Sequence, residues 1–377
     1  MDDPLQQLSL DELRGRSSKK WRAYDEDVLP MWVAEMDVPL APAIVATLTD
    51  AVTRGDTGYA HGREYARALA DFAEKRWGWT VDPARTVLVP DVMLGVVEML
   101  KLVTRAGEGV VINAPVYPPF HGFIGHLDRQ VVEVPLDAGH RLDLDALEAA
   151  FADEWVSAFL LCSPHNPTGT VHTAHELRVV AELADRHHVR VVSDEIHAPL
   201  VLGDARFVPY LSLPEATTGF AVLSASKAWN LAGVKAALAV AGERAAADLA
   251  RLPDEVSHGA SHLGVLSHTA ALREGVEWLD ALLVGLERNR RLLVERLAAE
   301  LPEVGYRPGG ATYLAWLDVR GLELGEDPAA AFLARGRVAL SSGKGFGEGG
   351  AGHVRLNFGT TPELLREGIR RMAASCR

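Results

Sequence analysis

The sequence predicts an α/β protein with two parts. In a large domain, helices cover both faces of a mostly parallel seven-stranded sheet, and a smaller α/β domain follows at the C-terminus. The chain has 377 residues, which is more than one domain of usual size holds. Its 48% hydrophobic and 24% charged residues are typical of a globular protein with a real core. Short apolar runs alternate with helix-length segments, and this pattern changes after about residue 275.

Residues 1–42 are expected to form an N-terminal arm that joins the small domain. The segment is irregular and contains several tryptophans and prolines, among them Trp21, Pro30, Trp32 and Pro39. Proline removes a backbone donor and restricts the preceding residue, so we expect an ordered arm rather than a helix.

Residues 43–275 are expected to form the large domain. Seven continuous apolar runs predict buried strands, namely Val87–Val89, Val110–Asn113, Val131–Val134, Ala158–Cys162, Val189–Ser193, Ala221–Leu223 and Ala237–Val240. Most are separated by helix-length segments such as Val92–Arg105 and Ala174–His187, and Ala43–Arg54 precedes the first. Because the sites of such sheets lie at the carboxyl ends of the strands, functional side chains are expected directly after them.

Residues 276–377 are expected to form the small C-terminal domain. The amphipathic stretch Val276–Leu301 predicts one long helix that ends before Pro302 and acts as the hinge between the domains. Short strands at Thr312–Val319 and His353–Phe358 and helices near Pro328–Arg335 and Pro362–Ala374 are expected after it.

Charge and cysteine content restrict the function classes. The chain has 38 basic and 51 acidic residues, a net charge of −13, which argues against nucleic-acid or anionic-membrane binding. Two cysteines cannot form a disulfide framework, and no 18-residue apolar run is present, so a cytoplasmic enzyme is expected. His258, His262 and His268 are not joined by a cysteine or a suitably spaced carboxylate, so no metal site is expected.

Three polar residues follow three of the predicted strands. Asn166 lies in a loop stiffened by prolines, although an ordinary turn has the same pattern. Asp194 ends a buried strand, where it needs a cation such as a pyridinium unless it caps a helix or forms a salt bridge. Lys227 lies among small and hydroxyl residues, where an amine can form a Schiff base, although a surface lysine also fits. Together they supply a donor to a ring hydroxyl, an anion for a ring nitrogen and an amine for an aldehyde, which pyridoxal 5′-phosphate requires.

The surrounding motifs resemble those of the fold-type I pyridoxal-phosphate enzymes in the class I/II aminotransferase superfamily. The shared motifs are Asn166-Pro167-x-Gly169, Asp194, Ser224-x-Ser226-Lys227 and Val354–Phe358, which contains Arg355. More specific motifs resemble the carbon–sulfur β-lyases of the MalY/PatB type, including cystathionine β-lyases. These motifs are Trp32–Asp37, Gly58-Tyr59, Pro115–Phe120, Ser163–Gly169, Ser193–His197 and Tyr313–Asp318. Together they extend over nearly the whole chain.

The resemblance implies roles around the cofactor ring. Lys227 would form the Schiff base and act as the general base at Cα, and Asp194 would keep the ring nitrogen protonated. Asn166 would bind the ring oxygen. His197 lies three residues after Asp194, where aminotransferases commonly have a tyrosine that touches the same oxygen, and a packed core histidine is the alternative. Tyr117 would stack on the ring, with a core aromatic as the alternative.

The resemblance also implies a phosphate site. The backbone amides of Val92 and Met93 begin a predicted helix, and Ser224 adds a hydroxyl. Lys235 lies where many aminotransferases have a phosphate-binding arginine, and a solvated surface lysine is the alternative. Asp91 replaces the usual glycine of the family, so we expect it to point away from the phosphate or to cap the helix.

Three further residues are implied for the substrate and for assembly. Arg355 would bind the substrate α-carboxylate as a bidentate pair through its guanidinium. Glu35 lies where the subgroup usually has an aspartate, and is expected near the substrate. Tyr59 resembles the tyrosine that reaches across the interface of such homodimers to the partner's phosphate, so a homodimer with shared active sites is expected.

The reaction implied by the subgroup motifs is α,β-elimination of L-cysteine thioethers. The substrate, a small amino acid such as cystathionine or a cysteine S-conjugate, would give a thiol, pyruvate and ammonia. An aminotransferase is the alternative, because it needs the same Lys227, Asp194 and Arg355. A regulator that only binds the cofactor is a third possibility of a different class.

Overall fold

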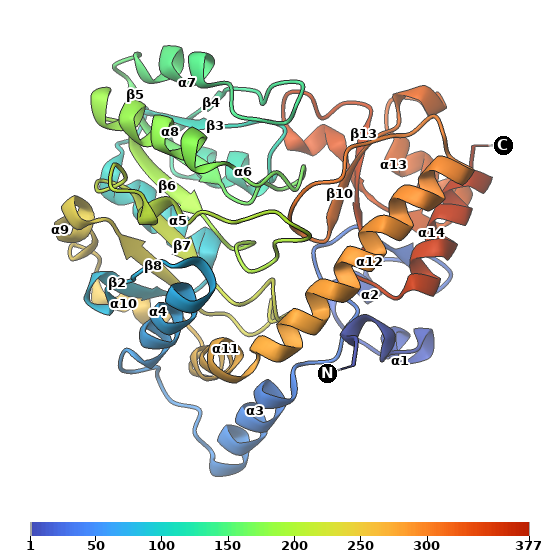
Figure 1. The fold of residues 1–377 in the computed structure, drawn as a ribbon, viewed down its shortest axis with the longest axis horizontal. Coiled ribbons are helices and arrows are strands. Elements are labelled where there is room, and N and C mark those ends of the chain that lie inside the picture. The colour runs from blue at the N-terminus through green and yellow to red at the C-terminus, as the bar shows by residue number, and fades with distance from the viewer. Residues whose placement is uncertain (1, 377) are drawn as a thin grey trace.

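A seven-stranded sheet forms the centre of the larger part of the molecule (Figure 1). The computed structural model describes residues 2–376, so the two end residues of the predicted arm and C-terminal domain, 1 and 377, lie outside it. The strand order is β2-β8-β7-β6-β5-β3-β4. The strands are β2 (Thr86–Val89), β3 (Gly109–Ile112), β4 (Gln130–Glu133), β5 (Val156–Cys162), β6 (Arg190–Asp194), β7 (Phe220–Leu223) and β8 (Ala237–Ala241). Within this sheet β8 runs opposite to the other six strands, so the predicted mostly parallel sheet is confirmed.

Helices cover both faces of this sheet, as the continuous apolar strands predict. Alternate residues of a strand point to opposite faces, so Ala158 and Leu160 pack with α5 and α6, whereas Phe159 and Leu161 pack with α7 and α8. The helices of this part are α3 (Pro42–Arg54), α4 (Glu64–Trp77), α5 (Val92–Val103), α6 (Pro119–His126), α7 (Leu144–Phe151), α8 (Ala174–Arg186), α9 (Ala246–Leu249), α10 (Asp254–His258) and α11 (His262–Glu274).

The helix α4 was not expected from the sequence. Its N-cap residue, Arg63, makes no side-chain hydrogen bond to the helix, so the usual start signal is missing. The helix is stabilised by burial of its apolar face, which includes Tyr65, Leu69 and Phe72.

The N-terminal residues contain two short helices, α1 (Leu10–Arg14) and α2 (Lys19–Arg22), so the expectation of an arm without helix is wrong there. A capping box explains α1, because Ser9 accepts a hydrogen bond from the Glu12 amide and the Glu12 side chain accepts one from Ser9. Further along, β1 (Leu29–Pro30) pairs in parallel with β11 (Val338–Ala339). The arm therefore contacts the C-terminal part of the chain.

The C-terminal part begins with α12 (Val276–Glu300), which runs from beside α11 towards the smaller sheet (Figure 1). That sheet is antiparallel, with the order β12-β13-β10-β9. Its strands are β9 (Gly305–Tyr306), β10 (Leu314–Asp318), β12 (Ser341–Ser342) and β13 (His353–Asn357), and the helices are α13 (Pro328–Ala331) and α14 (Pro362–Ala374). The strand predicted from residue 312 begins two residues later, because Thr312 has a left-handed backbone with φ of 71°.

The smaller α/β part confirms the predicted fold class, whereas the domain boundaries at residues 43 and 276 stay a prediction. Across residues 2–376, none of the helices combines the length and apolar character that crossing a membrane requires.

Candidate active site

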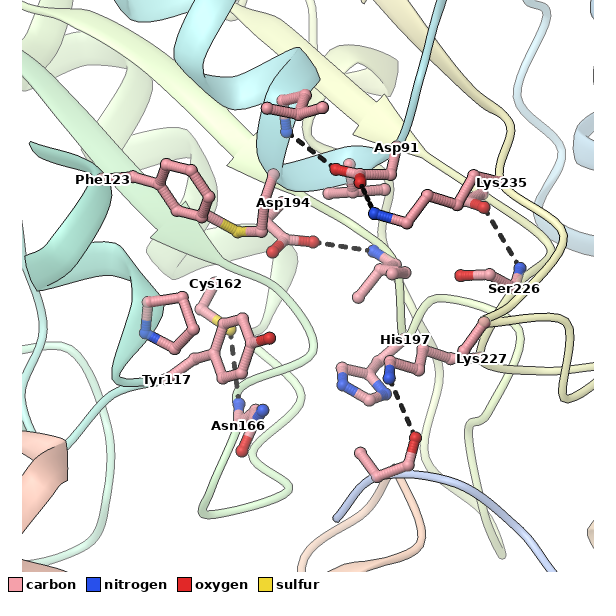
Figure 2. Close-up of a pocket in the computed structure, with 18 of the residues that line it drawn as sticks. Asp91, Tyr117, Phe123, Cys162, Asn166, Asp194, His197, Ser226, Lys227 and Lys235 are labelled. Atoms are coloured by element: carbon pink, nitrogen blue, oxygen red, sulfur yellow. Dashed lines mark hydrogen bonds and ion pairs between the residues drawn. The ribbon is translucent and has the colours of Figure 1, made fainter. Parts of the chain in front are cut away.

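A cavity of about 400 Å³ lies at the carboxyl ends of β5, β6 and β7 and at the N-terminus of α5 (Figure 2). Parallel strands end at one edge of a sheet, so the residues that follow them meet there. The cavity brings together all the predicted cofactor residues except Tyr59, namely Val92, Met93, Tyr117, Asn166, Asp194, His197, Ser224, Lys227 and Lys235.

Asp194 ends β6 with only 4% of its surface exposed. One carboxylate oxygen accepts a hydrogen bond from the Ile196 amide at 3.1 Å, and no ion pair to it occurs within the described chain. Burial raises the pKa of Asp194 to about 7, although the Ile196 amide and the charge of Lys227 act in the opposite direction. A buried carboxylate of this kind is stabilised in its ionised form by a cation, which a pyridinium nitrogen provides.

Lys227 follows β7 and points into the cavity from the side opposite Tyr117 (Figure 2). Its Nζ donates a hydrogen bond to the Ala34 carbonyl at 2.9 Å. Burial and the charge of Arg355 lower the pKa of Lys227 to about 8, while Asp194 and Glu35 oppose the shift. A substantial fraction of the amine is therefore neutral near physiological pH, as attack on an aldehyde requires.

Asn166 and Arg355 are directly bonded. The Arg355 Nη1 donates to Asn166 Oδ1 at 3.0 Å, and Nη2 donates to the Trp32 carbonyl at 3.0 Å and to Ser341 Oγ at 3.2 Å. Arg355 therefore lies behind Asn166 and does not line the cavity. Burial lowers the pKa of Arg355 to about 10, so it remains a cation at neutral pH.

His197 and Tyr117 are two aromatic side chains of the cavity wall. Burial, with the charges of Lys227 and Arg355, lowers the pKa of His197 to about 3, so its ring is neutral. Within residues 2–376 its buried Nδ1 has no hydrogen-bond partner. Burial and Asp194 raise the pKa of Tyr117, which keeps the phenol protonated.

The N-terminus of α5 forms another wall of the cavity. Asp91 is its N-cap and accepts a hydrogen bond from the Leu94 amide at 2.8 Å, so of the two expected arrangements the structure shows the cap. The other Asp91 oxygen pairs with Lys235 Nζ at 2.5 Å. Nearby, Ser224 Oγ donates to the Ala236 carbonyl at 2.7 Å.

Besides Arg355, two predicted site residues lie outside the cavity wall. Tyr59 is 83% exposed in the segment between α3 and α4, and its ring lies 5.7 Å from that of His258. Glu35 is half-buried, and its carboxylate accepts a hydrogen bond from Ser18 Oγ at 2.6 Å.

Some residues that line the cavity were not predicted from the sequence. Cys162 ends β5, and its sulfur accepts a hydrogen bond from the Asn166 amide at 3.4 Å. Burial raises the pKa of Cys162, so the thiol is neutral. The rule that identified Asp194, a polar residue at a strand end, applies equally to Cys162. Phe123 and Ile196 lie in the same wall, and nothing in their local sequence distinguishes them from core residues.

The three histidines considered for a metal are used in other contacts. His268 is buried and bonds Tyr65 and the Val234 carbonyl, whereas His262 pairs with Asp56. No group of three or more histidine, cysteine or acidic side chains within residues 2–376 is placed to hold a metal.

The sequence profile "Aminotransferase class I and II" matches residues 26–372. This chain belongs to the aminotransferase class I and II family. Pyridoxal 5′-phosphate is the cofactor, and the residues fit it. Asp194 suits the ring nitrogen and Lys227 the aldehyde, while the Nδ1 of His197, which has no partner among the described residues, suits a ring oxygen.

Individual relatives confirm the predicted resemblance over nearly the full length. A Mycobacterium leprae protein named "Putative cystathionine beta-lyase" is 55% identical, with 98% of this chain and 97% of the relative covered. The cystathionine β-lyase of Corynebacterium glutamicum is 36% identical, with 97% and 98% covered. A crystal structure from Corynebacterium diphtheriae, described as a "putative plp-dependent beta-cystathionase", is 34% identical with a TM-score of 0.95 and 99% of both chains covered.

Proposed function

We propose that this enzyme catalyses the α,β-elimination of L-cysteine thioethers, such as cystathionine or cysteine S-conjugates. The observation that carries the chemistry is one cavity that contains the Lys227 amine and the buried Asp194 carboxylate. The reaction type is supported by the relatives, because PatB of Bacillus subtilis, a cystathionine β-lyase, is 33% identical, whereas the transaminase AruH of Pseudomonas aeruginosa is 28% identical.

Arg355 binds the substrate α-carboxylate in this proposal. Its guanidinium is held by Asn166 on one side and by Ser341 and the Trp32 carbonyl on the other. These three acceptors fix the plane of the guanidinium, and its buried Nε, which has no hydrogen-bond partner within residues 2–376, remains to donate to the substrate carboxylate beside Asn166.

Lys227 transfers the proton that is removed from the substrate Cα. Bound in this cavity, pyridoxal 5′-phosphate supplies a sink for the electron pair that remains when Cα loses its proton. The neutral Lys227 amine takes that proton, and its ammonium is held by the Ala34 carbonyl. From there the proton passes to the departing sulfur, so the thiol leaves neutral. Asp194 holds the proton of the ring nitrogen throughout. With one water, the thioether gives a thiol, pyruvate and ammonia.

The proposal also covers the oligomeric state, the domain boundaries and the cellular location of the enzyme. We propose a homodimer in which Tyr59 serves the partner's site, supported by the exposure of Tyr59, Val45 and Val52, at 83%, 47% and 60%, along one surface segment. We propose domains at residues 43–275 and 276–377 with α12 as the hinge. A cytoplasmic location is supported by Cys162 and Cys376, which are both free thiols.

The test is an assay of the purified enzyme with L-cystathionine and with S-methyl-L-cysteine. We expect stoichiometric pyruvate and thiol from at least one of them. Accumulation of pyridoxamine 5′-phosphate and a keto acid that keeps its sulfur, without pyruvate, would refute the lyase in favour of transamination.

A further inference from the structure

Two oppositely charged side chains of the cavity wall are in direct contact. Asp91 is the N-cap residue of α5, and Lys235 lies in the loop between β7 and β8. Their side chains form an ion pair, with Asp91 Oδ2 2.5 Å from Lys235 Nζ. Both side chains line the cavity, and Figure 2 shows them on the side away from Tyr117 and Asn166.

The Asp91 carboxylate is held at both oxygens. While Oδ2 accepts from Lys235, Oδ1 accepts from the Leu94 amide at 2.8 Å and caps the 12-residue helix α5. The carboxylate therefore stays beside the backbone amides of Val92 and Met93, where the sequence predicts the site of the cofactor phosphate. A negative charge is thus built into the phosphate end of the cavity.

Lys235 is the cation that this end of the cavity offers. The other lysine in the described cavity wall, Lys227, is bonded to the Ala34 carbonyl. Arg355 is bonded to Asn166, outside the wall. A phosphate at the N-terminus of α5 must therefore share the Lys235 ammonium with Asp91 and tolerate a neighbouring negative charge.

We propose that Asp91 competes with the cofactor phosphate for Lys235 and so limits the affinity of the enzyme for pyridoxal 5′-phosphate. This inference rests on the proposed function and on the phosphate site predicted at the N-terminus of α5. Pairing with Asp91 neutralises the ammonium before the phosphate binds. The electrostatic attraction between Lys235 and the phosphate is therefore weaker than it would be for a free ammonium. The cofactor content of the enzyme then responds to the concentration of free cofactor.

The test compares Asp91→Asn with the wild type in the full chain after the cofactor has been removed. Asparagine is an equally good N-cap, so the helix end is kept while the charge is lost. We expect the dissociation constant of pyridoxal 5′-phosphate to fall about fivefold, the size of one partly exposed ion pair. The dissociation constant of pyridoxal, which has no phosphate, should not change. Both are measured by absorbance titration.

Asp143→Asn is the matched control. Asp143 caps α7 by accepting from the Ala146 amide at 3.0 Å, and it lies outside the cavity wall. Its replacement should leave both dissociation constants at the wild-type values. Thermal unfolding of the cofactor-free variants reports any loss of folding separately from cofactor binding.

Lys235→Gln completes a double-mutant cycle. This variant should bind pyridoxal 5′-phosphate more weakly, and Asp91→Asn should gain less in the Lys235→Gln background than in the wild type. Weaker binding by Asp91→Asn, equal gains in both backgrounds, or equal changes for pyridoxal would each overturn the inference. A wild-type chain that binds neither compound would instead refute the proposed function.

Discussion

At the scale of single residues, burial determines the protonation of the side chains in the cavity. The pKa of Asp194 is raised to about 7 and that of Lys227 is lowered to about 8, in both cases chiefly by burial. The pKa of His197 is lowered to about 3. Loss of hydration disfavours every charged form. Lys227 can therefore exchange a proton near neutral pH, and the Asp194 carboxylate is stabilised when a cationic ring binds beside it.

Replacement of Lys227 by alanine should abolish pyruvate release, because cofactor attachment and proton removal at Cα both use its Nζ. Borohydride reduction followed by mass spectrometry should find the cofactor on the Lys227 peptide of the wild type and no such adduct in the variant. Lys101→Ala is the control, because Lys101 forms a surface pair with Glu98 on α5. Pyruvate release by Lys227→Ala at the wild-type rate would contradict the assignment.

Asp194→Asn should lower kcat by several orders of magnitude and weaken cofactor retention. Loss of an anion beside a pyridinium costs several kcal/mol in a shielded site, and each ~1.4 kcal/mol is a factor of ten in rate. Steady-state pyruvate formation at saturating cofactor measures the effect. An unchanged kcat would mean that Asp194 acts only as a cap for the Ile196 amide.

The same substitution should change how stability depends on pH. The carboxyl of Asp194 has its pKa at about 7 in the folded chain and at its usual 3.8 when exposed. Between these values the folded chain keeps a proton that the unfolded chain releases, so this group lowers the free energy of unfolding as the pH rises. In the cofactor-free chain, the free energy of unfolding of Asp194→Asn should therefore rise relative to that of the wild type between pH 4 and pH 7. The difference should grow by up to about 4 kcal/mol. Urea unfolding at several pH values measures it, and a constant difference would contradict the shift.

At the scale of elements, the segment Trp32–Asp37, here called the strap, connects the two functional cations. Its main-chain carbonyls, rather than its side chains, make the contacts. The Trp32 carbonyl accepts from Arg355, and the Ala34 carbonyl accepts from both Lys227 and the Tyr313 hydroxyl at 2.9 and 3.0 Å. The strap therefore holds Lys227 and Arg355 in a fixed relation although it is neither helix nor strand.

A buried ion pair anchors the strap. Lys20 Nζ lies 2.7 Å from Asp37 Oδ2, and these side chains are 1% and 2% exposed. Lys20→Met leaves Asp37 buried without its cation and should cost about 3–5 kcal/mol of unfolding free energy. A loosened strap should also raise KM for the substrate, because Arg355 loses a fixed acceptor at Trp32.

Lys19→Met is the matched control for this substitution. Lys19 is exposed, and its ammonium lies 5.4 Å from the centre of the Trp32 ring. Its loss should cost about 1 kcal/mol or less. Chemical unfolding and steady-state kinetics compare the two variants, and equal losses would show that the buried pair does not anchor the strap.

At the scale of the whole molecule, the exposed position of Tyr59 leads to a prediction about assembly. Within its own chain Tyr59 lies outside the cavity wall, although its motif resembles one that binds phosphate. A twofold interface would place the same residue at the partner's cavity, and the exchange would be reciprocal.

Complementation between two inactive variants tests the shared site. Lys227→Ala and Tyr59→Ala are mixed under conditions of subunit exchange, and pyruvate formation is followed. If Tyr59 serves the partner, each heterodimer contains one site with both native residues, so activity returns towards a statistical fraction. If Tyr59 serves its own chain, every heterodimer site has one defect and no activity returns. A fully active monomer by light scattering would also exclude sharing.

The sequence by itself determined the sheet and the positions of the reactive groups. All seven predicted strands are present in one sheet, and Asp194, Asn166 and Lys227 follow three of them into one cavity. Apolar runs and polar strand ends are local signals, because burial of a strand on both faces imposes them residue by residue.

Which of these groups touch depends on how distant segments pack in three dimensions. The Lys227–Ala34 bond joins residues 193 positions apart, and the Asn166–Arg355 bond joins residues 189 positions apart. The Asp91–Lys235 pair links a helix cap to a distant loop. No local pattern marks such contacts, because backbone carbonyls are identical in every residue and an ion pair depends on how separate elements pack. The sequence therefore determined what chemistry the chain carries, and packing decided how each charge in the cavity is balanced.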